Sequence, residues 1–343
     1  MLWRASQYGN NNKIIADTNT SSVTKASDTS QSSPKKEDTT VKDTTNNQTA
    51  SAEKEEPIKE VKTKPYKIDT IAKADIKYDN DNHQNISDCM TTDGSAIYCY
   101  EKDNGIYKID ISSGKKEKVI DLEKWFSEQK EKEENNPDNI YNNDWKFGQI
   151  YYSKNQNSVY VMIRINKIGN CLFTLSGDSL ELQFKNAYYG SMLCDMANGE
   201  TFTGYGDGSC VVNLSTGEMK QLSLNRIYKA IEKDEKLYYI SNSYNVCSYD
   251  FVQGRTIFSF DGGYSEEGYF GDTYIFTVYN NAINKYTYAG TKKTGINFSD
   301  VEVKDSSDLT SDTRIKNIFI LPNENIVIYD SIVGAFRLIS KNS

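Results

Sequence analysis

The chain is poor in the residues on which most catalytic and metal sites depend. It has 343 residues and one histidine, His83, which lies in the polar stretch DNDNHQN. Catalytic triads and most zinc sites need histidine, so a single histidine argues against both. None of the six cysteines forms a C-x-x-C pair, and we interpret them as small buried residues of strands. We expect no catalytic residue, no metal site and no cofactor.

Long apolar runs and basic clusters are scarce as well. The sequence contains no run long enough for a transmembrane helix, and Met1–Asn12 has no apolar segment of the kind found in signal peptides. The net charge is -8, whereas nucleic-acid-binding proteins usually carry a basic face that neutralises phosphates. We therefore expect no nucleic-acid partner and no membrane contact by the folded part of the chain.

Aromatic residues are missing from Ala16–Lys64, which consists mainly of Ser, Thr, Asn, Asp, Lys and Glu. A segment of this composition has too little apolar surface to offset the entropy of ordering. We predict that residues 1–65 form a disordered linker and residues 66–343 form one folded domain. Polar linkers before folded domains are typical of bacterial surface proteins, so we expect a membrane anchor upstream of this sequence. A plain disordered tail is the alternative.

After residue 84 the chain repeats one pattern of strands and turns six times. In the first copy, Cys89–Leu122, alternating strands are separated by Asp93-Gly94, Asn104-Gly105 and Ser113-Gly114. Repeats of this length built from strands are typical of β-propellers. We predict an all-β, six-bladed β-propeller. The later copies cover Asp144–Phe184, Ala187–Leu224, Arg226–Phe260, Gly268–Phe298 and the chain from Arg314 onward.

The sixth copy has three strands where the others have four, and this would leave an unpaired edge in a closed ring. The strand-like segment Tyr66–Tyr78 precedes the first copy and belongs to none. We predict that it supplies the outer strand of the last blade and closes the ring. A seven-bladed ring is the alternative, because Asp121–Ser153 and Ser299–Thr313 are long.

The first copy also carries a family resemblance. Ile97-Tyr98-Cys99-Tyr100, Gly105, Ile106-Tyr107-Lys108-Ile109-Asp110 and Gly114 resemble the repeat of bacterial propellers related to the low-density-lipoprotein-receptor (YWTD-like) type. The later copies keep the turns and the apolar pattern but not the residues of this motif. No segment matches the WD dipeptide of other propellers. The resemblance implies a binding or scaffolding role and transfers no catalytic residue.

Loops between blades gather on one face of a propeller, and the longest of them here is Glu123–Asn143. Leu122, Trp125 and Phe126 are spaced as on one face of an amphipathic helix, which we predict to begin there. Trp125 and Trp145 flank the insertion. Exposed tryptophans bind sugars and peptides well, whereas packing in a core is the alternative for both.

A second candidate group lies in the loop DGGYSEEG, which contains Tyr264, Glu266 and Glu267. If this loop meets Asp79 and Asp81 at the channel, their oxygens could hold a hard cation; solvated acidic loops are the alternative. We take as candidate ligand-binding residues Trp125, Trp145, Tyr264, Glu266 and Glu267.

These features predict a monomeric, non-catalytic binding or scaffolding domain at a bacterial cell surface or outside the cell. Its expected partner is a protein or a glycan, bound through the loop face. Two other classes of function stay open. One is a glycan-active enzyme that uses carboxylates, and the other is a structural spacer domain.

Overall fold

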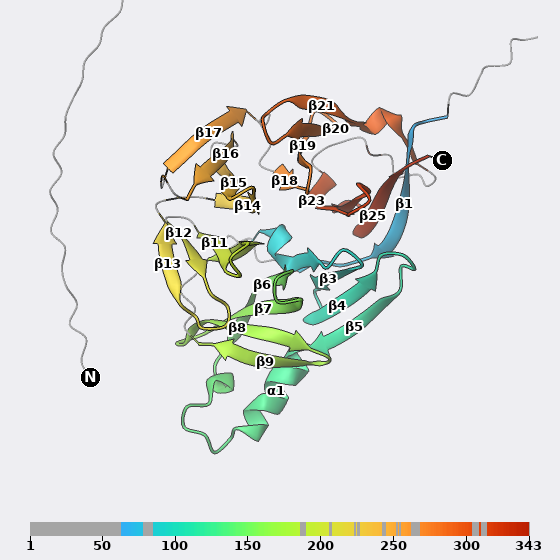
Figure 1. The fold of residues 1–343 in the computed structure, drawn as a ribbon. Helices are drawn as coiled ribbons and strands as arrows, with labels where there is room; N and C mark the ends of the chain where they lie inside the picture. The colour runs from blue at the N-terminus through green and yellow to red at the C-terminus, as the bar shows by residue number, and fades with distance from the viewer. Residues whose placement is uncertain are drawn as a thin grey trace, which may run out of the picture. The chain divides into compact units, whose positions relative to one another are not determined.

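The structure is a computed structural model that describes residues 63–77, 85–185, 190–205, 208–222, 224, 227–241, 245–251, 253, 255–261, 268–303, 309 and 314–342. Contacts divide the chain into two units, Met1–Glu60 and Val61–Ser343, and all described residues belong to the second. This unit is a six-bladed β-propeller made of six separate sheets (Figure 1). The predicted fold class is confirmed.

The first five blades are antiparallel four-stranded sheets built from consecutive strands. The first strand of each blade lies innermost, because β2 contacts β6, β6 contacts β10, β10 contacts β14 and β14 contacts β18. The strands of these blades are β2 (Met90–Thr92), β3 (Ala96–Tyr100), β4 (Gly105–Asp110), β5 (Lys116–Asp121); β6 (Trp145–Ser153), β7 (Ser158–Ile165), β8 (Gly169–Ser176), β9 (Ser179–Phe184); β10 (Ser191–Asp195), β11 (Thr201–Tyr205), β12 (Gly208–Val212), β13 (Met219–Leu222); β14 (Ile227–Lys233), β15 (Lys236–Ser241), β16 (Asn245–Asp250), β17 (Arg255–Asp261); and β18 (Gly268–Phe270), β19 (Tyr274–Tyr279), β20 (Ala282–Thr287), β21 (Lys292–Asn297).

Blade one illustrates why these residues form strands. Ile97 in β3 pairs with Ile109 in β4, and both side chains are fully buried, as expected of β-branched residues on a pleated surface. The turn from β4 to β5 needs Gly114, whose φ is +68°. A Cβ atom there would lie 2.5 Å from the Ile71 carbonyl oxygen, so only glycine fits where the closing strand passes.

The last blade has five strands in the order β22-β1-β25-β24-β23. β23 (Ile315–Ile320), β24 (Ile326–Asp330) and β25 (Ala335–Lys341) are consecutive, and β1 (Tyr66–Lys73) pairs antiparallel with β25. The predicted closure by the N-terminal segment is therefore confirmed. The strand ends at Lys73, earlier than predicted. Beyond it, Ala74 N–H donates to the Gly334 carbonyl, and Ile76 forms an isolated β-bridge with Glu101 of blade one.

The fifth strand of that blade was not predicted. β22 (Val301–Val303) pairs parallel with β1 and lies outside it. The long segment that contains it adds to blade six. The other long segment, Asp121–Ser153, supplies a helix and then β6. For both reasons the seven-bladed alternative is wrong.

A buried charge cluster ties the consecutive strands of blade six together. Asp330 ends β24 and is fully buried; its carboxylate accepts hydrogen bonds from Arg314 Nε at 3.2 Å and Arg314 Nη2 at 2.8 Å. Arg337 of β25 donates to the same carboxylate from Nη1 at 3.1 Å. Because Arg314 directly precedes β23, one carboxylate links all three strands.

All six cysteines are buried and free, which confirms their interpretation as small core residues. Five lie in strands as predicted, whereas Cys89 ends the helical turn η2. Burial raises the pKa of the Cys89 and Cys99 thiols well above the ordinary value. None of the helices in the described part of the chain combines the length and the apolar character needed to cross a bilayer.

Candidate functional site

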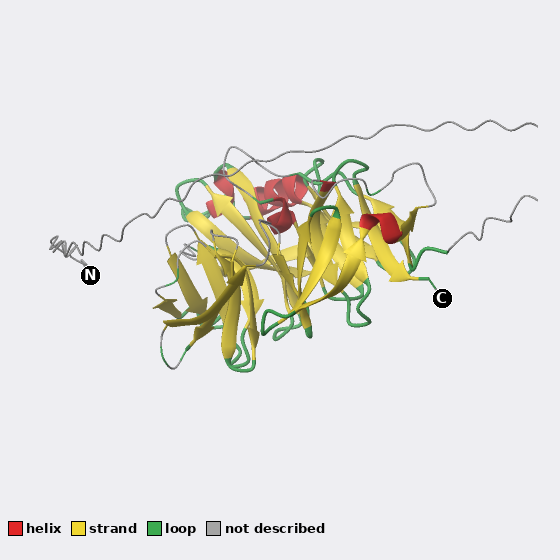
Figure 2. Ribbon diagram, turned by 90° about the horizontal axis from the view of Figure 1, so that it is seen from above, coloured by secondary structure: helices red, strands yellow, loops and turns green. Residues whose placement is uncertain are grey.

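Helical segments mark one face of the propeller. They are η2 (Ile86–Cys89), α1 (Leu122–Lys132), η3 (Ile140–Asn142) and η4 (Phe298–Asp300). η2 follows β1, α1 and η3 both lie between β5 and β6, and η4 follows β21. Each of these three strands is the fourth from the ring centre in its blade, so the three connections leave from the same end of the sheets. Figure 2 shows the helical segments, in red, gathered toward one side of the ring. We call this side the helical face.

η2 lies near the middle of the ring, where its cyan ribbon is visible in Figure 1. It contacts the innermost strands β2, β6 and β23. Asn85 caps it, with its side chain accepting from Ser87 N–H at 3.0 Å, while the Asp88 carboxylate accepts from Asn85 N–H at 3.3 Å. This reciprocal capping box fixes a short helical turn that is too brief to be stable alone. It places Asp88 toward the ring centre.

Four polar residues meet there, which we call the central cluster: Asp88 of η2, Gln149 of β6, Ser191 of β10 and Lys229 of β14. Gln149 Nε2 donates to Asp88 Oδ1 at 3.3 Å and to the Met192 carbonyl at 2.9 Å, and its Oε1 accepts from Met192 N–H at 2.7 Å. Gln149 is 5% exposed. Its amide therefore pairs with the backbone N–H and carbonyl of Met192 at the inner edge of β10, and it also binds the carboxylate of Asp88.

The electrostatics of Asp88 are unusual for an aspartate. Burial raises its pKa from 3.8 to about 6, because a carboxylate loses hydration energy at the ring centre. The positive charge of Lys229 and the hydrogen bonds from Asn85, Ser191 and Gln149 act in the opposite direction but are the weaker influence. A residue of perturbed pKa surrounded by convergent polar groups is characteristic of binding sites. Chemically the cluster offers one carboxylate, one ammonium group, an amide and a hydroxyl.

Trp125 of α1 and Trp145 of β6 lie in one aromatic cluster. Trp125 is 5% exposed; its ring meets Phe126, Tyr141 and Phe173 edge-on, and its Nε1 donates to Ser179 Oγ at 3.3 Å. Trp145 is half-buried and stacks on Phe126 with ring centroids 4.8 Å apart. The predicted helix is confirmed, and it buries the apolar side chains of its first turns. A ligand-binding role of either tryptophan stays a prediction.

The other sequence candidates fall outside the described residues. Tyr264, Glu266 and Glu267 occur between β17 and β18 in the sequence, and Asp79 and Asp81 precede η2. Their meeting at the channel stays a prediction. Within the described residues, no group of three or more His, Cys, Asp or Glu side chains is placed to hold a metal ion.

Sequence reasoning missed the central cluster. One signal for it was present, since Asn85-Ile86-Ser87-Asp88 has the spacing of a capping box just before the first strand. Nothing in the neighbouring sequence distinguishes Ser191 or Lys229 from other polar residues of the strands.

Comparisons with known proteins agree on the fold and go no further. No family model matches the chain, and no curated protein matches it. Among solved structures, an auxiliary nutrient binding protein from Bacteroides ovatus has a TM-score of 0.50 at 11% sequence identity, covering 82% of this chain and 78% of that one.

Two further structures are less similar. The WD40 β-propeller domain of Doa1 has a TM-score of 0.46 at 11% identity, covering 81% of this chain and 98% of that one. The extracellular domain of a candidate one-component system from B. thetaiotaomicron has a TM-score of 0.45 at 13% identity, covering 75% of this chain and 33% of that one.

Proposed function

We propose that this propeller is a non-catalytic binding module that recognises a protein or a glycan through its helical face, with the central cluster at the middle of the site. The observation that carries the proposal is the convergence of Asp88, Gln149, Ser191 and Lys229 from four separate elements. Burial of a carboxylate costs free energy. A protein that nevertheless keeps Asp88 at the ring centre gains most if the carboxylate binds a ligand through its charge or its hydrogen bonds.

The same geometry gives little support to the enzyme alternative. Glycoside hydrolysis needs two carboxylates that flank the bond to be broken. Among the described residues, the main charged influence on Asp88 is Lys229, and no second carboxylate is among the main influences on its pKa. A carboxylate beside an ammonium group suits recognition of polar or charged groups better than acid–base chemistry at two positions.

The setting of the protein is part of the proposal. The composition of residues 1–65 supports a flexible tether, and the repeat resemblance to receptor-type propellers supports display at the cell surface. The similar fold of an auxiliary nutrient binding protein adds a precedent for ligand binding by this architecture. We propose an extracellular or cell-surface binding role on this basis.

The test uses the full chain in thermal-shift and calorimetric screens against cell-wall glycans, soluble sugars and peptide libraries. A ligand that binds the folded state raises the melting temperature. We expect Asp88→Asn to raise the Kd of such a ligand about tenfold or more. The control is Asp69→Asn on the rim strand β1, where Asp69 pairs with Lys67 at a half-exposed site, and we expect it to leave binding unchanged.

Two outcomes would contradict the proposal. Equal binding by wild-type protein and Asp88→Asn would remove the central cluster from the site. Failure of every ligand class to bind would favour the spacer alternative.

A further inference from the structure

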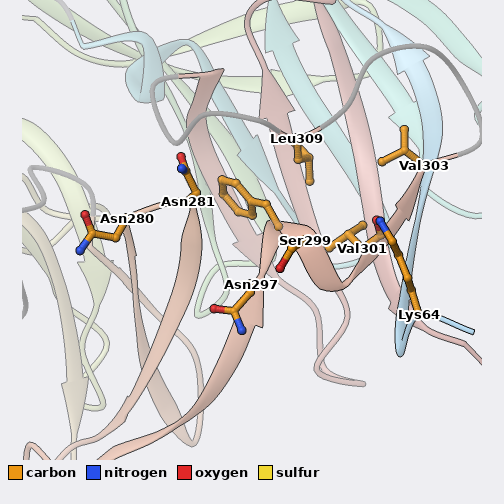
Figure 3. A pocket seen from close by; sticks show the side chains of 9 residues that line it. Lys64, Asn280, Asn281, Asn297, Ser299, Val301, Val303 and Leu309 are labelled. Carbon is orange, nitrogen blue, oxygen red and sulfur yellow. The ribbon is translucent and has the colours of Figure 1, made fainter. Parts of the chain in front are cut away.

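A hollow of about 520 Å³ lies beside η4 and the outermost strand β22 (Figure 3), and none of the residues that line it belongs to the central cluster. The turn between β19 and β20 forms one side of it, and η4 and β22 form the other. Its volume falls in the range of small-ligand sites, which is roughly 300 to 1,000 Å³. The hollow is therefore large enough for a short oligomer of sugar-sized units.

Uncharged polar side chains surround the hollow. Asn280, Asn281, Asn297 and Ser299 line it, and all four are exposed. Figure 3 shows the Asn280 and Asn281 side chains on one side and Asn297 nearby. Among the described residues, no hydrogen bond engages the side-chain amide of Asn280 or Asn281. Each amide offers one acceptor and two donors, which matches hydroxyl groups that both donate and accept.

The turn that presents these amides is held in place. Asn280 and Asn281 have φ angles of 53° and 56°, in the left-handed region that asparagine tolerates. The Asn281 carbonyl accepts from Phe298 N–H at 2.9 Å, which fixes the turn to η4. A polar rim that is fixed before binding loses less entropy when a ligand arrives.

The floor of the hollow is apolar. Phe298, Val301 and Leu309 line it, and each is at most 4% exposed. A ligand that contacts both the rim and this floor must therefore carry hydroxyl groups on its edge and C–H groups on its faces.

Charged groups around the hollow are engaged within the chain. Lys64 is the only charged residue among the described residues that line it, and its Nζ donates to the Val301 carbonyl at 3.1 Å. The neighbouring carboxylates of Asp300 and Glu302 accept from the amides of Asn297 and Asn342. Binding of a phosphate polymer requires several cationic side chains, and binding of a hard metal ion requires several carboxylate ligands. The lining of the hollow therefore suits an uncharged ligand better than either of these.

We infer that this hollow is a second binding site, and that its ligand is a neutral oligosaccharide of two or three units. The sugar hydroxyls bond the amides of Asn280, Asn281 and Asn297, and the C–H faces pack against Phe298. This site shares no residue with the central cluster, so the short oligosaccharide binds independently of Asp88.

The experiment is a glycan array of neutral and acidic oligosaccharides, followed by calorimetry with the full chain. The test variants are Asn280→Gly and Asn281→Gly, because glycine keeps the left-handed backbone and removes only the amide. Each is expected to raise the Kd for a neutral oligosaccharide about fivefold to tenfold, the loss of one hydrogen bond. The control is Asn157→Gly, which removes an amide from another left-handed turn, between β6 and β7, with φ of 47°.

The outcomes separate this site from the one under "Proposed function". Neutral-sugar binding that Asn281→Gly weakens, and that Asp88→Asn and Asn157→Gly leave unchanged, supports the inference. No neutral oligosaccharide on the array, or binding that neither asparagine variant weakens, overturns it. Binding of an extended peptide in place of the sugar, weakened by the same variants, also overturns the assignment.

Discussion

Blade one and blade six bury a carboxylate at the same place, directly after or at the end of the second strand, but hold it differently. Glu101 follows β3 and is 6% exposed; its carboxylate pairs with Lys116, whose side chain is 27% exposed. Asp330 ends β24, is fully buried and binds two buried arginines. Blade one comes from one continuous stretch of chain, whereas blade six is assembled from three separate stretches.

The difference indicates what each blade requires. Short hairpins already hold the strands of blade one in register, so one partly exposed lysine is sufficient for its carboxylate. Blade six must recruit β1 from the other end of the folded chain, and loop closure over such a length costs entropy. Its three consecutive strands therefore need a rigid base, and the Arg314–Asp330–Arg337 cluster provides one.

The largest expected effect follows from removing the centre of this cluster. Asp330→Asn removes the charge that Arg314 and Arg337 share, which we expect to lower the free energy of unfolding by about 3–5 kcal/mol. Chemical denaturation measures the loss. Asp69→Asn, which breaks an exposed ion pair on β1, is the control and should cost about 1 kcal/mol or less. A loss of similar size in both variants would remove the distinction between the blades.

Folding kinetics sharpen the comparison. Ile68 of β1 pairs with Ile339, whereas Ile97 pairs with Ile109 in the next strand, and all four are buried. Replacing either Ile68 or Ile97 by alanine should cost about 2–5 kcal/mol. Because distant contacts form late, we expect Ile68→Ala to speed unfolding and Ile97→Ala to slow refolding. Stopped-flow measurements on both variants would contradict this if Ile68→Ala slowed refolding equally.

The connection from blade six to blade one carries a pH dependence. Asp88 has a pKa of about 6 in the folded state, against an ordinary value of 3.8. Between about pH 4 and 6 the folded state holds the proton that the unfolded state has lost, so stability falls as pH rises through this window. The pKa shift corresponds to a decrease of at most about 3 kcal/mol in the free energy of unfolding across this window. Urea denaturation across this range should show the decline in wild-type protein and its absence in Asp88→Asn, and identical profiles would contradict the assignment.

The smallest expected effect concerns the carboxylate of blade one. Glu101→Gln removes a charge-assisted hydrogen bond with Lys116, and we expect a loss of about 1.5–3 kcal/mol. Glu117→Gln on β5, where Glu117 pairs with Lys115 at an exposed site, should change stability by less than about 0.5 kcal/mol. A larger loss of stability from Glu101→Gln than from Asp330→Asn would contradict the view that blade six depends more on its buried carboxylate than blade one does.

Much of the fold could be predicted from the sequence, because the features that define it are local. The turns of blade one and the spacing of Leu122, Trp125 and Phe126 lie within single repeats. The closing strand was also predictable, because the last repeat is one strand short. β22 was not, since three residues are too few to show alternation and its partner β1 lies far away in the sequence.

The central cluster could not be predicted for a related reason. Asp88 directly precedes the first repeat and Lys229 lies in the fourth, and their proximity depends on ring closure rather than on any spacing along the chain. The hollow has the same origin, because Lys64 and Asn281 line one hollow only when β1 joins blade six.

The closure also brings the two ends of the folded ring together. Tyr66 pairs with Lys341, and Asn342 N–H donates to the Pro65 carbonyl at 2.9 Å. A short peptide joining residue 342 to residue 65 would thus span almost no distance, and the ring could then be opened at an exposed turn in another blade. Circular permutation of this kind is tolerated where termini are adjacent. The order of the blades along the gene is therefore one of several that the same architecture would accept.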